Sequence, residues 1–306
     1  MANLKDIKTR IQSVQNTKKI TRAMKMVAAA KVKKAESTVK SARPFATELT
    51  TIFKRMLGAV KGEYSLENLN VKSAIDNYPA LLEQREVKTV GLLVLTSNKG
   101  LAGAYNANVI RKTLAMIDEY NNKGIKVLLF LIGQKGISGL KRKIESRNCE
   151  IVKTYLAVAN DVTSTGARLI AEDVADYFVN KYIDKIELVT TRFKNMMSYS
   201  VQSWDILPLS DDMHEDHEGI DPLMIFEPCV HGILQSIVPM FISNIIYQAL
   251  LEAQASELAS RMTAMSAASN NAEEMIRLLS IDYNKARQWA ITQEIVEIVS
   301  GANALK

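Results

Sequence analysis

The residues best suited to chemistry in this sequence are two histidines set among carboxylates. The stretch DDMHEDHE, residues 211–218, places His214 and His217 three positions apart beside five acidic side chains. Imidazole and carboxylate groups are common ligands of divalent metals. Prolines and a glycine flank the stretch, however, and they predict a loop rather than a helix. A solvated acidic loop is the preferred interpretation, and a divalent-metal site is the alternative.

A second candidate is a glycine-containing turn, TSNKGLAGAYN, at residues 96–106. It follows an apolar run and precedes a helical pattern, which is where phosphate-binding loops occur. The spacing differs from GxGxxG, and Lys99 precedes Gly100 instead of following a glycine. The turn therefore reads more simply as a strand-to-helix connection in which Gly100 and Gly103 permit tight backbone geometry.

Nucleophile–base arrangements are not evident in this sequence. Three histidines are present, no carboxylate pair stands out, and Cys149 and Cys229 form no CxxC motif. We expect no catalytic residues, no metal and no cofactor. Two cysteines without a disulfide framework also favour a reducing compartment.

Positive charge is concentrated in the first 43 residues. Twelve Lys or Arg residues stand there against Asp6 and Glu36, so the segment carries +10 and the remainder −4, for a net charge of +6. Such asymmetry indicates a solvated face or an acidic protein partner, and a nucleic-acid or membrane-surface binder is a further alternative. The run at 17–34 has no aromatic residue that could stack on a base.

Membrane-spanning and secretory segments are not expected. The first residues, MANLKDIKTRIQSVQ, lack an apolar core, and we expect no uncharged apolar run near the roughly 20 residues that a span needs.

The elements that position these residues begin with a long amino-terminal helix. Its apolar positions first recur at spacings of three and four, and then slip by three, which predicts a locally overwound coiled coil. These positions are Leu4, Ile7, Ile11, Val14, Thr17, Ile20, Met24 and Val27. The helix should reach at least Arg43, and Pro44 should either kink it or begin a continuation toward Gly58.

A second long helix is predicted at the other end, from Pro239 to Ala302, on the order of 95 Å at about 1.5 Å per residue. Its core positions keep a regular heptad spacing. They are Leu251, Ala255, Leu258, Met262, Met265, Ser269, Ala272, Ile276, Leu279, Tyr283, Ala286 and Ala290. Small side chains at such positions let two helices approach closely, so we expect an antiparallel coiled coil of the two termini.

Between the helices, strand and helix patterns alternate. Residues 87–97, 125–133 and 185–193 read as strands, and 104–121, 134–147 and 161–182 read as helices. This alternation predicts a Rossmann-like α/β domain with a mainly parallel sheet. The expected division is 1–58 for the first coiled-coil helix, 59–209 for the α/β domain, 210–222 for the acidic loop and 223–306 for the second helix.

The last helix ends in an apolar tip. Ile295, Val296, Ile298 and Val299 lie in its final turns, although chain ends normally face water. The tip should therefore dock into a partner.

Several motifs resemble the gamma subunit, or central rotor shaft, of F-type ATP synthases, and the similarity extends over essentially the whole chain. At the carboxyl end these are Ile291-Thr292-Gln293-Glu294, Glu297 and Gly301-Ala302-Asn303-Ala304. The others are Ser13–Glu36, SARPFA (41–46), SNKGLAGAYN (97–106), FEP (226–228) and YNKARQ (283–288). The family turn usually reads Ser-Asp-Arg-Gly-Leu-Cys-Gly, so Asn98, Lys99 and Ala102 are departures from it.

The resemblance implies a non-catalytic rotor that transmits torque between an ion-driven membrane ring and the catalytic alpha/beta hexamer during ATP synthesis or hydrolysis. Implied partners are the alpha and beta subunits, with one copy of this chain per three of each, the epsilon subunit and the membrane c-ring. The implied location is peripheral, on the cytoplasmic face of a bacterial plasma membrane. A helical scaffold with a basic nucleic-acid-binding arm and a nucleotide-dependent enzyme built on the α/β domain are the competing hypotheses.

The resemblance also assigns contact residues. Those toward the hexamer are Met24, Lys19, Arg22, Lys25, Lys99, Ala102, Arg261, Gln288, Thr292 and Glu294. The apolar tip, Ile295, Ile298 and Val299, would be a bearing in a hydrophobic sleeve. Met224 and Phe226 would meet the epsilon subunit and the ring.

Overall fold

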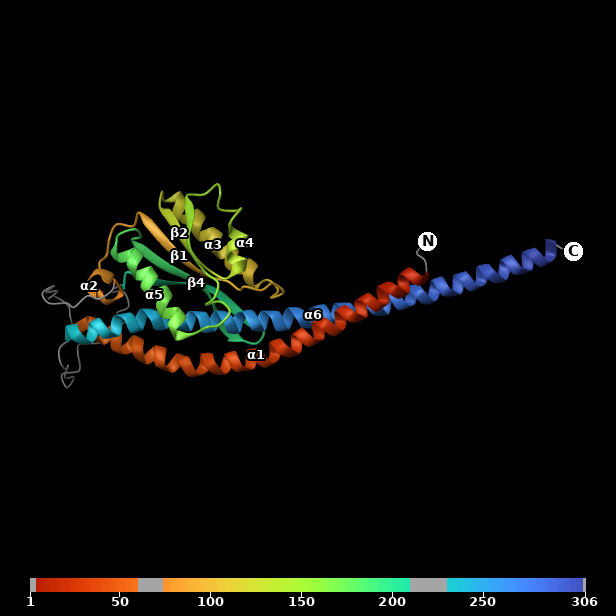
Figure 1. The fold of residues 1–306 in the computed structure, drawn as a ribbon, viewed down its shortest axis with the longest axis horizontal. Coiled ribbons are helices and arrows are strands. Elements are labelled where there is room, and N and C mark those ends of the chain that lie inside the picture. The colour runs from red at the N-terminus through yellow and green to blue at the C-terminus, as the bar shows by residue number, and fades with distance from the viewer. Residues whose placement is uncertain (1–3, 60–73, 210–229, 305–306) are drawn as a thin grey trace. The chain divides into compact units, whose positions relative to one another are not determined.

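A computed structural model describes residues 4–59, 74–209 and 230–304. Two long helices, α1 (Leu4–Ala59) and α6 (Val230–Ala304), occupy the two ends of the sequence (Figure 1). The contacts divide the chain into two units, Lys31–Ser260 and the pair Met1–Ala30 with Arg261–Lys306. The larger unit holds the sheet, and the smaller one holds the outer segments of the two helices.

The larger unit contains a five-stranded sheet in the order β3-β2-β1-β4-β5. Pairing is parallel throughout except between β4 and β5, which are antiparallel neighbours. The strands are β1 (Thr89–Leu95), β2 (Lys126–Ile132), β3 (Cys149–Tyr155), β4 (Lys185–Asn195) and β5 (Ser198–Leu207). The prediction of a mainly parallel α/β domain is thus confirmed.

Helices cover both faces of this sheet (Figure 1). On one face α3 (Tyr105–Asn122) and α4 (Gln134–Leu140) bury an apolar cluster against the central strands. On the other face α5 (Ser164–Val179), α6 and the second half of α1 enclose a larger cluster, joined by η1 (Ala74–Asp76) and α2 (Tyr78–Leu81). Burial on both faces explains why β1 and β2 are almost entirely apolar.

The sequence patterns missed two strands and overextended one helix. Both missed strands, β3 and β5, lie at sheet edges, where alternate residues are polar and only partly buried. Their sequences, CEIVKTY and SYSVQSWDIL, therefore lack the continuous apolar run that revealed β1 and β2. The helix predicted over 134–147 ends at Leu140 and gives way to turns before β3.

Within the larger unit, the second half of α1 packs along α6. The rings of Phe53 and Phe241 stack with centroids 4.2 Å apart. Pro44 lies inside α1, so the helix continues through the proline. This agrees with the expectation that Pro44 begins a continuation toward Gly58. Every predicted core position of α6, from Leu251 to Ala290, is buried or half-buried, which confirms the heptad assignment.

The slip predicted in α1 is wrong. Ile20 and Val27 are 60% and 57% exposed, whereas Thr21 and Ala28 are buried. The buried side follows a 4, 3 spacing through Val14, half-buried Lys18, Thr21, Ala28 and Val32, except at position 25, where Lys25 is exposed and the neighbouring Met24 is half-buried instead. Assigning core positions by hydrophobicity alone produced the apparent slip, because a lysine stem and a threonine occupy core positions here.

In the smaller unit, the outer segments of the two helices also form an ion pair. The Nζ atom of Lys18 lies 3.0 Å from Oε1 of Glu273. Because the Glu273 side chain is 68% exposed, this pair contributes little stability and mainly matches the charges of the two helices.

By length and composition, α6 is apolar enough to cross a membrane within Gly232–Asn303, contrary to the expectation that no such run exists. The core helix of a soluble protein passes the same test. The apolar residues of the first turns, including Leu234, Val238, Phe241 and Ile242, are buried in the cluster beneath the sheet. Their hydrophobicity is therefore used in the fold.

A backbone constraint at the end of β2 yields a stability prediction. Gly133 has φ +92°, and a Cβ placed there would lie 2.2 Å from the carbonyl oxygen of Thr96. Gly133→Ala should lower the free energy of unfolding by more than about 2 kcal/mol, because a positive φ alone costs an alanine about 1–2 kcal/mol. Denaturant unfolding of the chain measures this.

Gly124→Ala is the matched control, since Gly124 has φ +74° and no atom near its would-be Cβ. Gly124→Ala should lower the free energy of unfolding only by the cost of holding an alanine at a positive φ. Equal losses for the two variants would contradict the steric argument.

Candidate partner-binding surface

Three cations on α1 form the basic part of the candidate surface. Lys19, Arg22 and Lys25 are exposed, and within the described residues no ion pair joins them to an acidic side chain. The buried Thr21 and Ala28 orient the helix, which directs these cations outward. Exposed cations with no internal partner can attract an acidic surface.

The same helix carries an apolar stripe that the sequence analysis misassigned. Ile20, half-buried Met24 and Val27 follow one another at spacings of four and three, which places them on one side of the helix. Two of the three are largely exposed. Continuing the heptad strictly from Val14 leaves Ile20 and Val27 outside the core, although it would also have placed the exposed Lys25 inside it. Together, stripe and cations form an amphipathic docking face.

The strand-to-helix turn is held by its own side chains. The amide of Asn98 donates to the carbonyl of Leu156 and to Oδ1 of Asn160, each at 2.8 Å, and its oxygen accepts from the backbone N–H of Gln134 at 2.9 Å. Asn106 accepts from the Ser97 N–H at 3.0 Å. These bonds favour the structural interpretation of the turn over a phosphate-binding loop.

Backbone conformation refines the roles of the two glycines. Gly103 has φ +55° and needs the freedom of glycine, whereas Gly100 does not adopt a positive φ. Leu101 does, with φ +64°, and its side chain is 61% exposed. A leucine held in this conformation on the surface is a further contact candidate beside the exposed Lys99. No composition signal could have revealed it.

Ala102 differs from the expectation that it contacts a partner. Its side chain is only 2% exposed, and its carbonyl accepts a hydrogen bond from Oγ of Ser260 at 2.7 Å. The residue anchors the turn to α6, and its side chain is not accessible to a partner.

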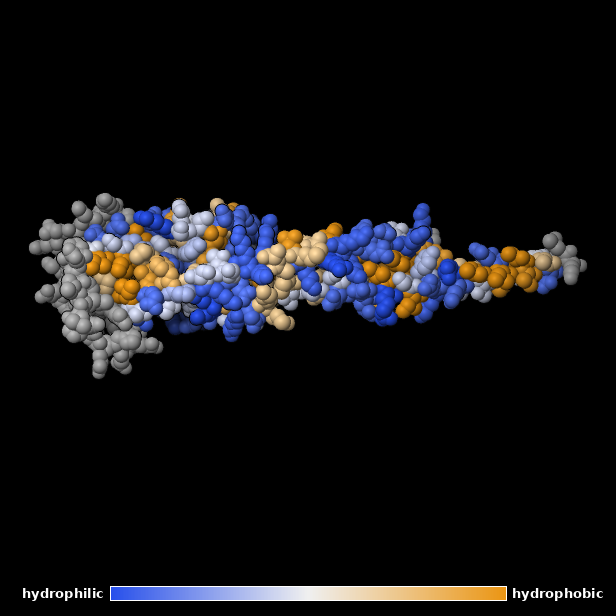
Figure 2. Space-filling model, turned by 90° about the horizontal axis from the view of Figure 1, so that it is seen from below, coloured by the Kyte–Doolittle hydropathy of each residue, from blue (hydrophilic) through white to orange (hydrophobic). Residues whose placement is uncertain are grey.

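The carboxyl-terminal contact candidates lie where α6 loses its buried side. Arg261 is half-buried, and Gln288, Thr292 and Glu294 are exposed. Every residue from Ile291 to Asn303 is exposed. Ile295, Ile298 and Val299 are 55%, 71% and 53% exposed, and Figure 2 shows apolar surface gathered near this end of α6.

Other sequence candidates lie outside the described residues. These are the acidic stretch 211–218 with His214 and His217, and the two foot residues Met224 and Phe226. Among the residues that are described, no group of three His, Cys, Asp or Glu side chains could hold a metal.

The surface therefore offers cations, an apolar stripe and an apolar helix end, which are means of binding proteins. The fold and these features define a two-helix coiled-coil protein with an inserted α/β domain that acts through partner contacts.

Comparison with known proteins identifies the family. A family model described as ATP synthase matches residues 3–305. ATP synthase gamma chains from Gloeothece citriformis and Synechococcus sp. (strain JA-3-3Ab) are 41% and 40% identical to this chain. Each alignment covers the full length of this chain and of the relative. The Tetrahymena thermophila mitochondrial ATP synthase central stalk is 27% identical, with a TM-score of 0.57, covering 82% of this chain and 99% of its own. The chain belongs to the ATP synthase gamma chain family.

The hydrogen bonds of the turn predict the effect of one substitution. In Asn98→Asp, a carboxylate would face the two acceptor oxygens of Leu156 and Asn160, so the free energy of unfolding should fall by about 1–3 kcal/mol at neutral pH. The control is Asn195→Asp, because the Asn195 oxygen already accepts from Met197 and Ser198. Thermal unfolding should separate the two variants, and equal melting temperatures would refute the assignment.

Proposed function

We propose that this chain is the rotor of an ATP synthase, a non-catalytic subunit that transmits torque between an ion-driven membrane ring and the catalytic alpha/beta hexamer. Family membership over the full length carries the proposal. Two features of the structure support it. One is the pair of long helices, and the other is a surface with exposed cations, an apolar stripe and an apolar helix end that can contact other proteins.

The contact with the hexamer has two parts in this proposal. Lys19, Arg22 and Lys25 attract acidic segments of the beta subunits, and the stripe of Ile20, Met24 and Val27 packs against their apolar side chains. Lys99, Leu101, Arg261, Gln288, Thr292 and Glu294 complete the set. Differential contact as this surface turns gives each beta subunit a different conformational bias.

The apolar tip acts as a bearing. Ile295, Ile298 and Val299 are exposed in the free chain, so their burial in a sleeve of the hexamer would stabilise the assembly by removing apolar surface from water. Apolar contacts have little directional preference, and they keep the shaft on its axis without selecting one angle.

In this proposal the chain divides into a shaft, an α/β domain and a connection, and two residues contact the membrane side of the complex. Residues 1–58 and 223–306 form the shaft, 59–209 the α/β domain and 210–222 a connection, with Met224 and Phe226 assigned to the epsilon subunit and the c-ring. The Tetrahymena stalk was determined together with a c-ring. In this proposal the chain lies peripherally on the cytoplasmic face of a bacterial plasma membrane.

Reconstitution tests the proposal. Matching alpha and beta subunits are assayed for ATP hydrolysis with and without this chain, after gel filtration. Co-elution of one copy with three alpha and three beta subunits, with sustained turnover only in its presence, is the expected result. Absence of association would refute the proposal, and salt-sensitive DNA binding by the chain alone would favour a nucleic-acid scaffold instead.

A substitution of Met24 tests the proposed docking face. Met24→Lys adds a cation between Lys19, Arg22 and Lys25, so the contact with an acidic segment should become too strong at one rotational angle. In membrane-bound complex, ion pumping per ATP hydrolysed should fall by about half or more, while hydrolysis stays within about twofold.

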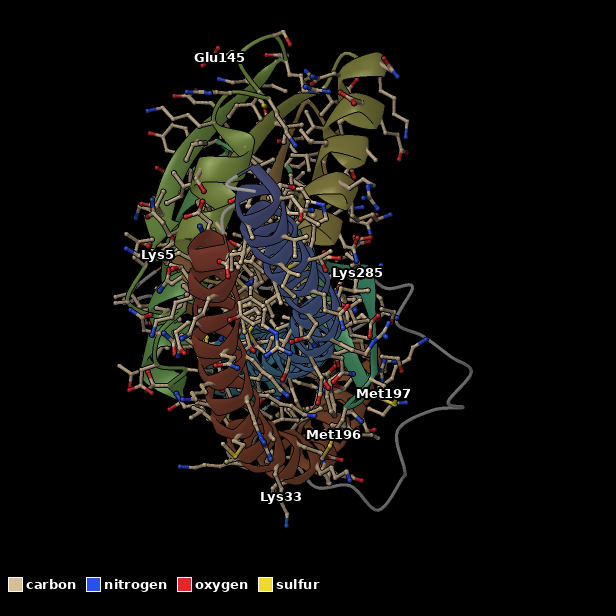
Figure 3. The ribbon with its side chains drawn as sticks, turned by 90° about the vertical axis from the view of Figure 1, so that its right-hand side faces the viewer. Lys5, Lys33, Glu145, Met196, Met197 and Lys285 are labelled. Atoms are coloured by element: carbon tan, nitrogen blue, oxygen red, sulfur yellow. The ribbon has the colours of Figure 1, made fainter. Side chains whose placement is uncertain are left out.

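The control variant is Met197→Lys, at an 85% exposed position in the β4–β5 connection (Figure 3). It should pump normally. Unchanged pumping per ATP in Met24→Lys would exclude the proposed docking face.

Substitutions in the apolar tip test the proposed bearing. A triple variant, Ile295→Ala with Ile298→Ala and Val299→Ala, should leave the unfolding free energy of the isolated chain within about 0.5 kcal/mol, because these side chains are exposed. Its affinity for the hexamer should fall about tenfold or more, since buried apolar anchors carry much of an interface energy.

The matched control triple, Met275→Ala with Leu278→Ala and Ile281→Ala, removes similarly exposed apolar groups outside the tip. Titration of labelled chain into hexamer measures both. A tip triple that binds as tightly as the control would disprove the bearing.

A further inference from the structure

Arg43 of α1 connects three elements of the larger unit at one point. Its Nε lies 3.2 Å from Oε1 of Glu252 in α6, and its Nη2 donates to the backbone carbonyl of Phe193 in β4 at 2.9 Å. The N–H of Phe193 in turn donates to the other oxygen of Glu252 at 3.2 Å. The guanidinium, the carboxylate and the backbone N–H and C=O of one residue of β4 therefore form a closed set of bonds.

Glu252 is an unusual residue for its place. Its side chain is fully buried, and Gln248 also donates to it at 3.4 Å. A buried carboxylate is costly unless it is paired and hydrogen-bonded, and an apolar residue of similar volume would serve stability as well or better. Val39, Phe193, Leu251 and Ala255 of the adjoining apolar cluster are buried, and Ser256 and Glu257 of α6 are buried as well.

The contrast between this set and its surroundings suggests a mechanical role. Apolar seams between helices resist separation, but their contacts have little directional preference, so they define the relative orientation of two elements less sharply than directional bonds do. Charge-assisted hydrogen bonds have defined lengths and angles, and a guanidinium that donates to two acceptors also fixes orientation.

Other polar contacts hold the sheet region to α6 without reaching α1. Oγ1 of Thr190 donates to the carbonyl of Ala249 at 3.4 Å, and Oγ of Ser260 donates to that of Ala102 at 2.7 Å. Arg43 adds α1 to this attachment.

We propose that Arg43, Glu252 and the backbone of Phe193 form a torque joint that locks both helices to the α/β domain, so that force applied to the domain turns α1 and α6 as one body. This inference rests on the proposed rotor function. Without these bonds, α1 can shift against α6 under load. Part of each rotational step then deforms the chain instead of turning it.

Three variants of the chain, assembled in the complete membrane-bound complex, test the joint. Arg43→Leu removes the bonds and leaves the Glu252 charge buried and uncompensated. Arg43→Lys keeps the charge but loses the planar fork. The double variant Arg43→Met with Glu252→Met removes both charges and keeps the volume apolar. Lys40→Leu is the control, because it removes a 69% exposed cation from the same helix.

The measurement is ion pumping per ATP hydrolysed against an increasing ion gradient, with the melting temperature of the complex recorded in parallel. In Arg43→Leu, pumping per ATP at high gradient should fall about threefold or more while hydrolysis stays within about twofold, since charge-assisted bonds are lost. Arg43→Lys should be intermediate, and Lys40→Leu should match the wild type.

The double variant separates a mechanical role from a structural one. Its melting temperature should recover toward the wild type, because no unpaired charge remains buried, yet its pumping at high gradient should stay low. Recovery of both stability and pumping would overturn the joint. A wild-type chain that supports no pumping at all would instead refute the rotor function, so the two failures are distinguishable.

Discussion

The structure depends on apolar seams between two helices that come from opposite ends of the chain. In the larger unit the seam runs through Val32, Val39, Leu251 and Ala255, and it merges with the apolar layer beneath the sheet. In the smaller unit Thr21, Ala28, Met265 and Ala272 are the buried positions. Because one side of each helix is used in this way, the other sides remain available, and we propose that the exposed cations and apolar residues on them contact partners.

The α/β domain completes this arrangement because it supplies directional contacts. Its mainly parallel sheet is covered on both faces, and β4 and the turn before α3 meet α6 through hydrogen bonds as well as through apolar packing. A rotor needs both kinds of interaction: non-directional contact where it slides against other subunits, and directional contact where force must pass between its own parts. The proposed bearing at the tip of α6 and the proposed joint of Arg43 and Glu252 are examples of these two kinds of interaction.

Sequence reasoning predicted the parts of the fold that have strong periodicity. The α6 heptads from Leu251 to Ala290 and the buried strands β1, β2 and β4 were evident, and the recognised motifs indicated the family. Edge strands β3 and β5 were missed because their half-polar sequences resemble loops. The α1 core was misplaced because Lys18 and Thr21 occupy core positions while Ile20 and Val27 do not. Burial of Ala102, the conformation of Leu101 and the Arg43 contacts arise from tertiary packing, which no local pattern encodes.

Direct observation of rotation tests the central claim. The alpha/beta hexamer is fixed to a surface, and a fluorescent probe is attached to this chain through Met197→Cys, an 85% exposed position, after Cys149 and Cys229 are replaced by serine. The account predicts that the probe turns in one direction while ATP is hydrolysed and stops when ATP is removed. A probe that stays fixed, or that moves without direction during steady hydrolysis, would contradict the assignment of this chain as the rotor.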